Sequence, residues 1–333
     1  MIKLLAGLVV LVCLPTGILS AQTDRCNGYP IDVYGNCTKT VVISRLTVQN
    51  TKGNLDLSLW AQGLGGGWKT AVTYFNLASH VIEAQVDFVG SDGNLASVFV
   101  YRSDDKSFTP ISITDSQMAP GSSISLRALA VAKGGMMTED LVSGYIMITF
   151  KSMNPIDLDA ETAVSYGEEL WFSHWYFDSI GNMLFKPSWL ADPVTYSLLP
   201  GTFRYRFGLM PGNDTEGEKV GLSLANPSDA PVTAMLTLKC SNGTVVANGT
   251  TVVQPWTSMD SMLDAYFPGV FESGTLSVWT LEIVTTSGAV APFAVKVKGD
   301  GGTALVDNFE PAVTGAAAAA MVKSLARPAR FQR

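Results

Sequence analysis

Residues 68–95 read WKTAVTYFNLASHVIEAQVDFVGSDGNL, and residues 218–245 read EKVGLSLANPSDAPVTAMLTLKCSNGTV, which is a related pattern shifted by 150 positions. The two stretches align without a gap, and Asn76 falls on Asn226. A self-match at a fixed offset indicates that one structural unit occurs twice in a chain. The sequence therefore predicts a tandem repeat.

Each stretch predicts two strands joined by a turn. Apolar residues alternate with polar or small ones in both, which is the period of two expected for a strand with one buried face. Asp92-Gly93 and Asn242-Gly243 then supply dipeptides that tolerate positive φ in a two-residue hairpin turn. We expect the same hairpin at both places.

The similarity continues downstream around Pro120 and Pro255, where the offset is shorter and the loops differ in length. We place repeat 1 at residues 40–192 and repeat 2 at residues 193–312. Short runs rich in Val, Thr and Ile, separated by Pro and Gly, predict an all-β fold of two tandem β-sandwich domains. A helical turn is expected within residues 259–267.

The N-terminus has the order of a secretory signal peptide. Lys3 precedes an apolar run from Leu4 to Leu14, and small residues follow at Ser20 and Ala21. We assign residues 1–21 to the signal peptide. No later run has the roughly 18 apolar residues that a membrane-spanning helix needs. The sequence thus predicts an exported protein in the periplasm, at the cell surface or outside the cell, with no transmembrane segment after cleavage.

Three cysteines remain after residue 21. Cys26 and Cys37 enclose a short segment rich in Gly, Pro and Asn within residues 22–39, and an oxidising compartment permits disulfides. We predict a Cys26–Cys37 disulfide and an unpaired Cys240 in a strand. The last segment, residues 313–333, is an Ala-rich basic tail, either a short helix or a disordered end.

Repeat 2 resembles uncharacterised β-sandwich repeats of secreted environmental bacterial proteins. The resemblance rests on the turn at Asn226, the run VTAMLTLKCSNGTVV, a loop centred on a proline, a helical turn ending in Phe-Pro-Gly at 267–269, and Ser-Gly-Thr-Leu from 273. Repeat 1 departs from it because Leu77 replaces the proline of that turn. The resemblance implies an immunoglobulin-like sandwich and assigns no catalytic residue.

Composition and motifs limit the chemistry that the chain offers. Charged residues make up 15% of the chain and the net charge is -7, so no basic surface for nucleic acid is expected. The chain has two histidines, His80 and His174, and it lacks the common hydrolase, zinc-protease and nucleotide-binding motifs. We expect no metal, no cofactor and no catalytic residue of those classes.

The most distinctive local feature is the aromatic segment from residue 166 to residue 189. Aligning residues 171–183 with residues 293–305 at an offset of 122 places both at the last hairpin of their repeats. On this alignment Phe172, His174 and Tyr176 fall on the face where repeat 2 has Ala294 and lysines, which we interpret as the outer face. Large apolar groups on an outer face need cover. Either the neighbouring domain or N-terminal segment covers them, or they form a ligand platform for sugar or protein.

These observations support two functional hypotheses. The first is a non-catalytic binding or structural protein that contacts a glycan or a surface protein through Phe172, His174 and Tyr176. The alternative is an extracellular carbohydrate-active hydrolase, because glycoside hydrolysis needs only two suitably spaced carboxylates. The candidate carboxylates for that reaction are Asp157, Asp159, Glu161, Glu168 and Glu169.

Overall fold

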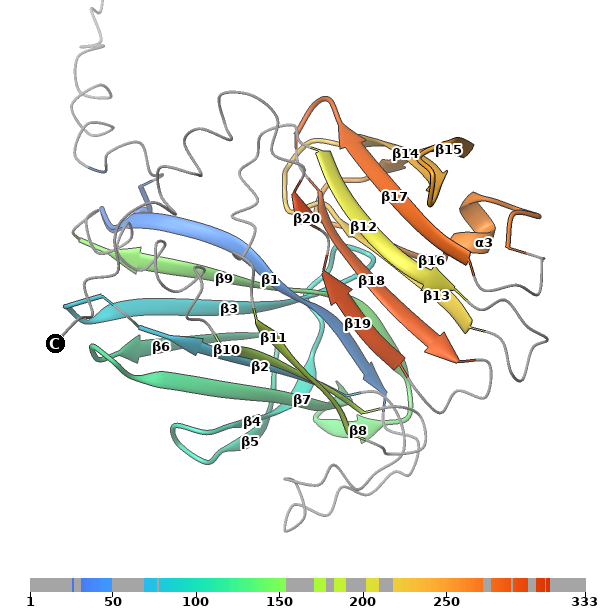
Figure 1. The fold of residues 1–333 in the computed structure, drawn as a ribbon. Coiled ribbons are helices and arrows are strands. Elements are labelled where there is room, and N and C mark those ends of the chain that lie inside the picture. Colours follow the sequence, from blue (N-terminus) through green and yellow to red (C-terminus); the bar gives the residue numbers. More distant parts are fainter. Residues whose placement is uncertain are drawn as a thin grey trace, which may run out of the picture.

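The computed structural model consists almost entirely of antiparallel β-strands arranged in four sheets (Figure 1). This confirms the all-β prediction. The structure describes residues 26, 31–49, 69–76, 78–153, 171–177, 183–189, 202–209, 218–271, 277–288, 290–298, 304–308, 310 and 311. The predicted signal peptide, the boundary at residues 192 and 193, and the tail of residues 313–333 lie outside these ranges. Within them, no helix is long and apolar enough to cross a membrane.

Two sheets of the first half, called sheets A and B, enclose one hydrophobic core. Sheet A has the strand order β1-β9-β3-β6, and sheet B has the order β11-β10-β2-β7-β4-β5, with β8 beside β7. Phe88 from sheet A and Tyr74 from sheet B are among the side chains buried between them. The strands are β1 (Cys37–Gln49), β2 (Lys69–Phe75), β3 (Ile82–Gly90), β4 (Val98–Arg102), β5 (Phe108–Ile111), β6 (Ile113–Met118), β7 (Ser123–Lys133), β8 (Met136–Thr138), β9 (Leu141–Ser152), β10 (Trp171–Phe177) and β11 (Met183–Trp189).

Two sheets of the second half, sheets C and D, enclose a second core. Sheet C has the order β15-β14-β17-β12-β20, and sheet D has the order β16-β13-β18-β19. Leu236 and Leu281 of sheet C pack with Leu222 of sheet D in this core. The elements are β12 (Thr202–Leu209), β13 (Glu218–Ala225), β14 (Val232–Cys240), β15 (Val245–Val253), β16 (Ser258–Met262), α3 (Leu263–Tyr266), β17 (Ser277–Thr285), β18 (Ala291–Lys298), β19 (Ala304–Asn308) and β20 (Glu310–Pro311). The helical turn expected within residues 259–267 is thus α3, preceded by strand β16.

The order of strand pairing in sheets A and B occurs again in sheets C and D. The order β1-β9-β3-β6 has the counterpart β12-β17-β14-β15, and the order β11-β10-β2-β7 has the counterpart β19-β18-β13-β16. Strands β3 and β14 begin and end at the same offset of 150 that the sequence match has. Within the described residues, the hairpin of β4 and β5 is found in the first half only.

A buried asparagine makes the same hydrogen bonds in each half. The Asn76 side-chain amide donates to the carbonyl oxygens of His80 at 2.8 Å and Met118 at 2.7 Å, and its Oδ1 accepts from the Ala78 amide at 2.9 Å. Asn226 makes the corresponding bonds to the carbonyl oxygens of residues 230 and 253, and accepts from the amide of residue 228. Each asparagine therefore fixes the loop after its strand to the end of a strand in the opposite sheet.

The turns at Gly93 and Gly243 are alike, but they differ from the expected two-residue turn. The Gly93 amide donates to the Gly90 carbonyl at 2.9 Å, and the Gly243 amide donates to the Cys240 carbonyl at 2.9 Å. Gly93 has φ +84° and Gly243 has φ +85°, whereas Asp92 and Asn242 keep negative φ. One left-handed residue after a β-turn is the arrangement of a three-residue hairpin loop, so only the glycine of each dipeptide carries the positive φ. A full hairpin follows only in the second half, where β14 pairs with β15; in the first half a single bridge, Val89–Leu95, follows the turn, and the prediction of the same hairpin at both places is wrong there.

A second pair of turns places a tryptophan in a glycine conformation. The Ser122 amide donates to the Ala119 carbonyl at 3.0 Å, with Pro120 and Gly121 (φ +72°) between them. The matching turn, from Gln254 to Thr257, has Pro255 followed by Trp256, whose φ is +60°. Proline followed by a left-handed residue is typical of a type II turn, in which glycine is preferred at the third position. Trp256 therefore holds a backbone conformation that costs an ordinary residue about 1–3 kcal/mol.

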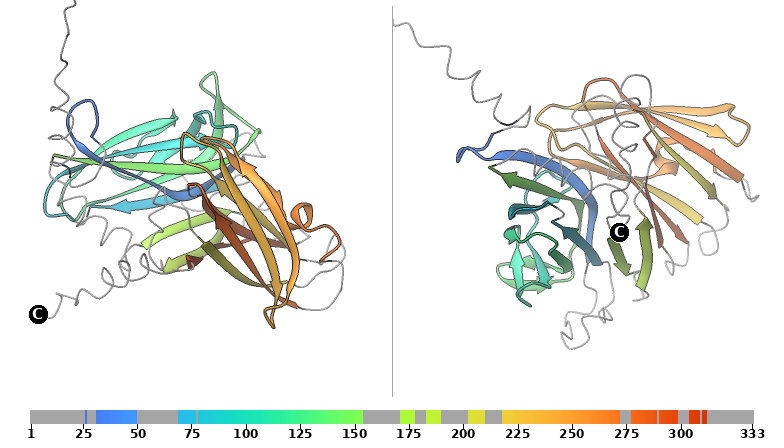
Figure 2. Two further views of the ribbon diagram at one scale, coloured as in Figure 1. Left: turned by 90° about the horizontal axis from the view of Figure 1, so that it is seen from above. Right: turned by 60° about the vertical axis from the view of Figure 1, so that its left-hand side comes forward.

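The halves contact each other through a small apolar junction beside this turn. Val89, Tyr145 and Met147 of sheet A pack against Ala225, Ala291 and Phe293 of sheet D. The Tyr145 hydroxyl donates to the Trp256 carbonyl at 2.8 Å, and the Ser258 amide donates to the Ser91 carbonyl at 3.1 Å. The sheets of the two halves accordingly lie side by side in the views of Figure 2.

Candidate functional site

Strand β10 carries Phe172, His174 and Tyr176, the binding residues expected from the sequence. Its backbone pairs with β11 on one side and with β2 on the other. The hairpin of β10 and β11 therefore occupies in sheet B the place that β18 and β19 occupy in sheet D. The structure describes the backbone of these three residues and not their side chains, so their role in binding stays a prediction.

The structure corrects the face assignment on which that prediction depended. We expected Phe293 to face the core of the second half and Ala294 to face solvent. Instead, Ala294 is buried in the core between sheets C and D, where it lies opposite Leu222, and Phe293 packs on Val89 and Tyr145 in the junction. Residues on both faces of β18 are buried, because a core lies on one side and the junction on the other. Alternation along this strand therefore does not identify an outer face.

The strand register also corrects our alignment of the two hairpins. Phe177 pairs with Lys69, and Val297 pairs with Lys219, which is the residue that matches Lys69 at the offset of 150. The structural counterpart of Val297 is thus Phe177, whereas the sequence alignment had placed Trp175 there. The sequence alignment is therefore shifted by two residues. Because side chains alternate with a period of two, Phe172, His174 and Tyr176 still share one face of β10.

The carboxylates of the hydrolase hypothesis lie outside the described residues. These are Asp157, Asp159, Glu161, Glu168 and Glu169. The hydrolase hypothesis therefore stays a prediction.

The cysteine predictions are confirmed. Cys26 and Cys37 form a disulfide with a Cα–Cα distance of 5.4 Å, and both residues are buried in the first core. The bond ties residue 26 to the first residue of β1. Cys240 is free and partly buried, and its thiol lies 2.8 Å from Asn242 Oδ1.

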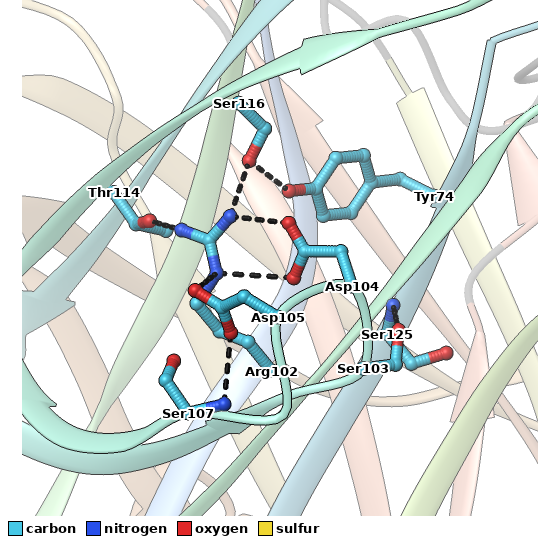
Figure 3. Close-up of polar contacts among 9 residues, drawn as sticks. All are labelled: Tyr74, Arg102, Ser103, Asp104, Asp105, Ser107, Thr114, Ser116 and Ser125. Atoms are coloured by element: carbon cyan, nitrogen blue, oxygen red, sulfur yellow. Dashed lines mark hydrogen bonds and ion pairs between the residues drawn. The ribbon is translucent and has the colours of Figure 1, made fainter.

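The structure adds a polar cluster between the edges of sheets A and B, centred on Arg102 of β4 (Figure 3). The guanidinium donates to both carboxylate oxygens of Asp104, at 3.2 Å from Nε and 2.6 Å from Nη2. It also donates to Thr114 Oγ1 and, at 3.1 Å, to Ser116 Oγ on β6. The Tyr74 hydroxyl of β2 lies 3.2 Å from the same Ser116 oxygen. The cluster therefore joins two strands of sheet B to the edge strand of sheet A.

The loop between β4 and β5 is held to this cluster by a second carboxylate. Asp105 Oδ2 lies 3.7 Å from Arg102 Nε, and its Oδ1 accepts from the Ser107 amide at 2.8 Å. The hydrogen bonds from Ser107 lower the pKa of Asp105, and the hydrogen bond to Asp104 raises the pKa of Arg102. Both shifts favour the ionised forms of Asp105 and Arg102.

The Arg102 cluster has the properties of a structural contact. The Arg102 side chain is only 13% exposed, and its donors are directed at Asp104, Thr114 and Ser116. A charge-assisted bidentate pair of this kind fixes geometry and leaves no basic group for proton transfer. Sequence reasoning missed it because the β4–β5 hairpin has no counterpart in the second stretch. The available signal was a run of charged residues at 102–106 in a chain that is otherwise poor in charge.

Alkaline pH is expected to destabilise the first half through Tyr74. Burial raises the pKa of Tyr74 from 10.0 to about 12, so the unfolded chain ionises first as the pH rises. The stabilisation from the neutral hydroxyl is complete below pH 10 and is lost between pH 10 and 12. Two pKa units correspond to about 2–3 kcal/mol. Denaturant unfolding at pH 8 and pH 11.5 should therefore show a smaller pH-dependent loss in Tyr74→Phe than in the unmodified protein.

Tyr34→Phe is the matched control for this measurement, because Tyr34 is 84% exposed. It should keep the pH dependence of the unmodified protein. Equal pH dependence in Tyr74→Phe and the unmodified protein would contradict the burial argument.

No protein-family model matches this sequence, and a comparison with curated proteins gives no match. The functional proposal therefore depends on the geometry and the sequence alone.

Proposed function

We propose that this chain is an exported, non-catalytic structural or binding protein built from two diverged copies of one immunoglobulin-like β-sandwich module. The observation that carries the proposal is the recurrence of one strand order in both halves. The shared hydrogen bonds of Asn76 and Asn226 support it, because they occur at equivalent loops. An internal copy explains why the sequence match at the offset of 150 coincides with matching strand ends.

The contact between the halves favours a structural role. Tyr145 reaches the Trp256 carbonyl, and an apolar cluster that includes Phe293 surrounds this bond. Such contacts restrict the relative orientation of neighbouring modules more than a linker alone does, although only a large apolar interface would hold it fixed. The two modules would then present a defined surface rather than two independent ones.

Export is supported by the disulfide and by the order of residues 1–21. Disulfides persist in oxidising compartments, and Cys26 and Cys37 are joined in the structure. We place the protein in the periplasm, at the cell surface or outside the cell.

The Arg102 cluster adds a further argument for a structural module, since its polar groups are directed at one another.

The proposed contact is a glycan or a surface protein, bound by the aromatic residues of β10. The argument comes from the sequence: Phe172, His174 and Tyr176 alternate along one strand, and aromatic rings suit the flat faces of sugars. The unusual concentration of aromatic residues around β10 supports this choice over other segments.

Co-sedimentation with insoluble polysaccharides tests the proposal. We expect the full chain, exported and purified, to bind at least one of cellulose, chitin and peptidoglycan without releasing soluble sugar. The double change Phe172→Ala with Tyr176→Ala should weaken binding at least tenfold, whereas Tyr34→Ala, an exposed aromatic residue elsewhere, should not. If the ligand is a protein, the chain should instead bind isolated cell envelopes, and protease treatment of the envelopes should abolish this binding.

Two outcomes would count against the proposal. Release of soluble sugars that is lost in the double variant Glu168→Gln with Glu169→Gln would favour the hydrolase. Binding that is unaffected by the aromatic changes would place the contact elsewhere.

A further inference from the structure

Strand β15 ends sheet C and is an exposed edge. It pairs with β14, and within the described residues it has no strand on its other side. Val245 is 49% exposed, and Val246 and Val252 are each 46% exposed. A strand edge with open hydrogen-bonding groups is a template for another strand, and proteins usually protect such edges with charge or proline.

The other strands that end the four sheets carry this protection. Eight strands end the strand orders of the four described sheets, and seven of them contain a charged residue or a proline. The seven are β1 with Lys39 and Arg45, β6 with Asp115, β11 with Lys186 and Pro187, β5 with Pro110, β20 with Glu310 and Pro311, β16 with Asp260, and β19 with Asp307. The counterpart of β15 in sheet A is β6, where the Asp115 side chain is 60% exposed. Among these eight, only β15, with the sequence VVANGTTVV, lacks both features, and its one irregularity is a β-bulge at Val246. The three-residue strand β8, which pairs with β7 alone, also lacks both features, but its shortness limits the edge that it offers.

The sequence of β15 is complementary to itself in the antiparallel direction. About a centre at Gly249, Val246 falls opposite Val252, and residues 247 and 248 (Ala-Asn) fall opposite residues 251 and 250 (Thr-Thr). Val245 lies beyond the β-bulge at Val246 and is exposed, whereas Val253 is buried, so the symmetric stretch is residues 246–252. Each pair joins residues of the same parity, so both members lie on the same face of the sheet. A two-fold symmetric contact requires this kind of self-complementarity.

We propose that β15 pairs antiparallel with β15 of a second copy of this chain, about a two-fold axis at Gly249, so that two C sheets become one continuous sheet. On the outer face, Val252 of each copy lies beside Val246 of the other, and this removes two exposed apolar pairs from water. No like charges meet along the paired strands, because β15 contains none. The inference is independent of the glycan contact proposed above and concerns assembly alone.

Sedimentation equilibrium of the full exported chain tests the assembly. We expect a reversible dimer at micromolar concentrations. The double change Val246→Lys with Val252→Lys brings lysines of the two copies together and should raise the dimer dissociation constant at least tenfold. Val278→Lys is the matched control: Val278 is 44% exposed on the outer face of the same sheet but lies on β17, and this change should leave the constant unchanged.

Cysteine cross-linking tests the register without depending on the lysine variants. In a Cys240→Ser background, Asn248→Cys protein mixed with Thr250→Cys protein should form a disulfide-linked dimer under mild oxidation, with the bond between positions 248 and 250. Directly paired residues in antiparallel strands have Cα atoms about 4.5–5.5 Å apart, which a disulfide can span. A Val278→Cys variant should not cross-link.

A monomer at all concentrations up to about 100 μM would overturn the proposal, since reversible protein contacts commonly have dissociation constants in the micromolar range or below. A dimer that resists the double lysine change, or one that weakens equally with Val278→Lys, would also overturn it.

Discussion

Replacing Gly144 by alanine is expected to lower the free energy of unfolding by about 3 kcal/mol or more. Gly144 lies on β9 between Leu46 of β1 and Gly90 of β3. A Cβ atom at this position would stand 1.9 Å from the Val89 carbonyl oxygen and 2.9 Å from backbone atoms of Gly90. The obstacle is backbone, so no rotation of a side chain relieves it. Strands β3 and β9, the two inner strands of sheet A, would have to separate where β3 ends.

Gly249→Ala is the control for this prediction. A Cβ on Gly249 would meet its neighbours at ordinary contact distances of 3.7 to 4.0 Å, and its φ is not in the left-handed region. We expect that change to lower the free energy of unfolding by no more than about 0.5 kcal/mol. Denaturant unfolding followed by circular dichroism compares the two. A Gly144→Ala protein as stable as the Gly249→Ala protein would contradict the predicted backbone clash.

Asn76→Ala and Asn226→Ala should each destabilise the protein by about 3 kcal/mol. Each asparagine is completely buried and makes three hydrogen bonds to backbone groups. Alanine would leave the carbonyls of Met118 or Val253 buried without this donor. Because the two positions correspond, the costs should be similar although the loops have different sequences.

Asn242→Ala provides the comparison for this pair. Asn242 is exposed, and its Oδ1 accepts from the Thr244 amide at 2.9 Å within a turn. Water replaces that bond readily, so the loss should be about 0.5–1 kcal/mol. Chemical unfolding of the three variants measures the difference. Costs for Asn76 and Asn226 that differ by several-fold would argue against equivalent loops.

Local chemistry made part of the fold predictable from the sequence. The match at the offset of 150 located β2 and β3 together with β13 and β14, because alternation and turn residues are set within a few positions. The Cys26–Cys37 disulfide was predictable from compartment and spacing. The similarity around Pro120 and Pro255 corresponds to two turns of the same geometry, with Gly121 in one and a strained residue in the other.

The faces of β18 were not predictable by the same means. Alternation along a strand distinguishes a buried face from a solvent-exposed face only if one face is exposed to solvent. Strand β18 does not meet this condition, because Phe293 and Ala294 are both buried, each against a different partner. The position of one half against the other depends on contacts far apart in the sequence, such as that of Tyr145 with Trp256. The Arg102 cluster was missed for a similar reason, since it joins β4 to β6 through a hairpin without an internal counterpart. The binding role of Phe172, His174 and Tyr176 therefore stays a prediction.

The left-handed turn at Trp256 is held by a hydrogen bond from the other half of the chain. Tyr145 precedes Trp256 by 111 positions, so it leaves the ribosome first, and domains generally fold in that direction. If the first half folds first, the hydroxyl that binds the Trp256 carbonyl is in place on sheet A when the turn at residues 254–257 forms. Sheet A would then act as a template that offsets the cost of an otherwise unfavourable backbone conformation. Exchanging the order of the halves in the gene would remove that template at the moment when the turn needs it.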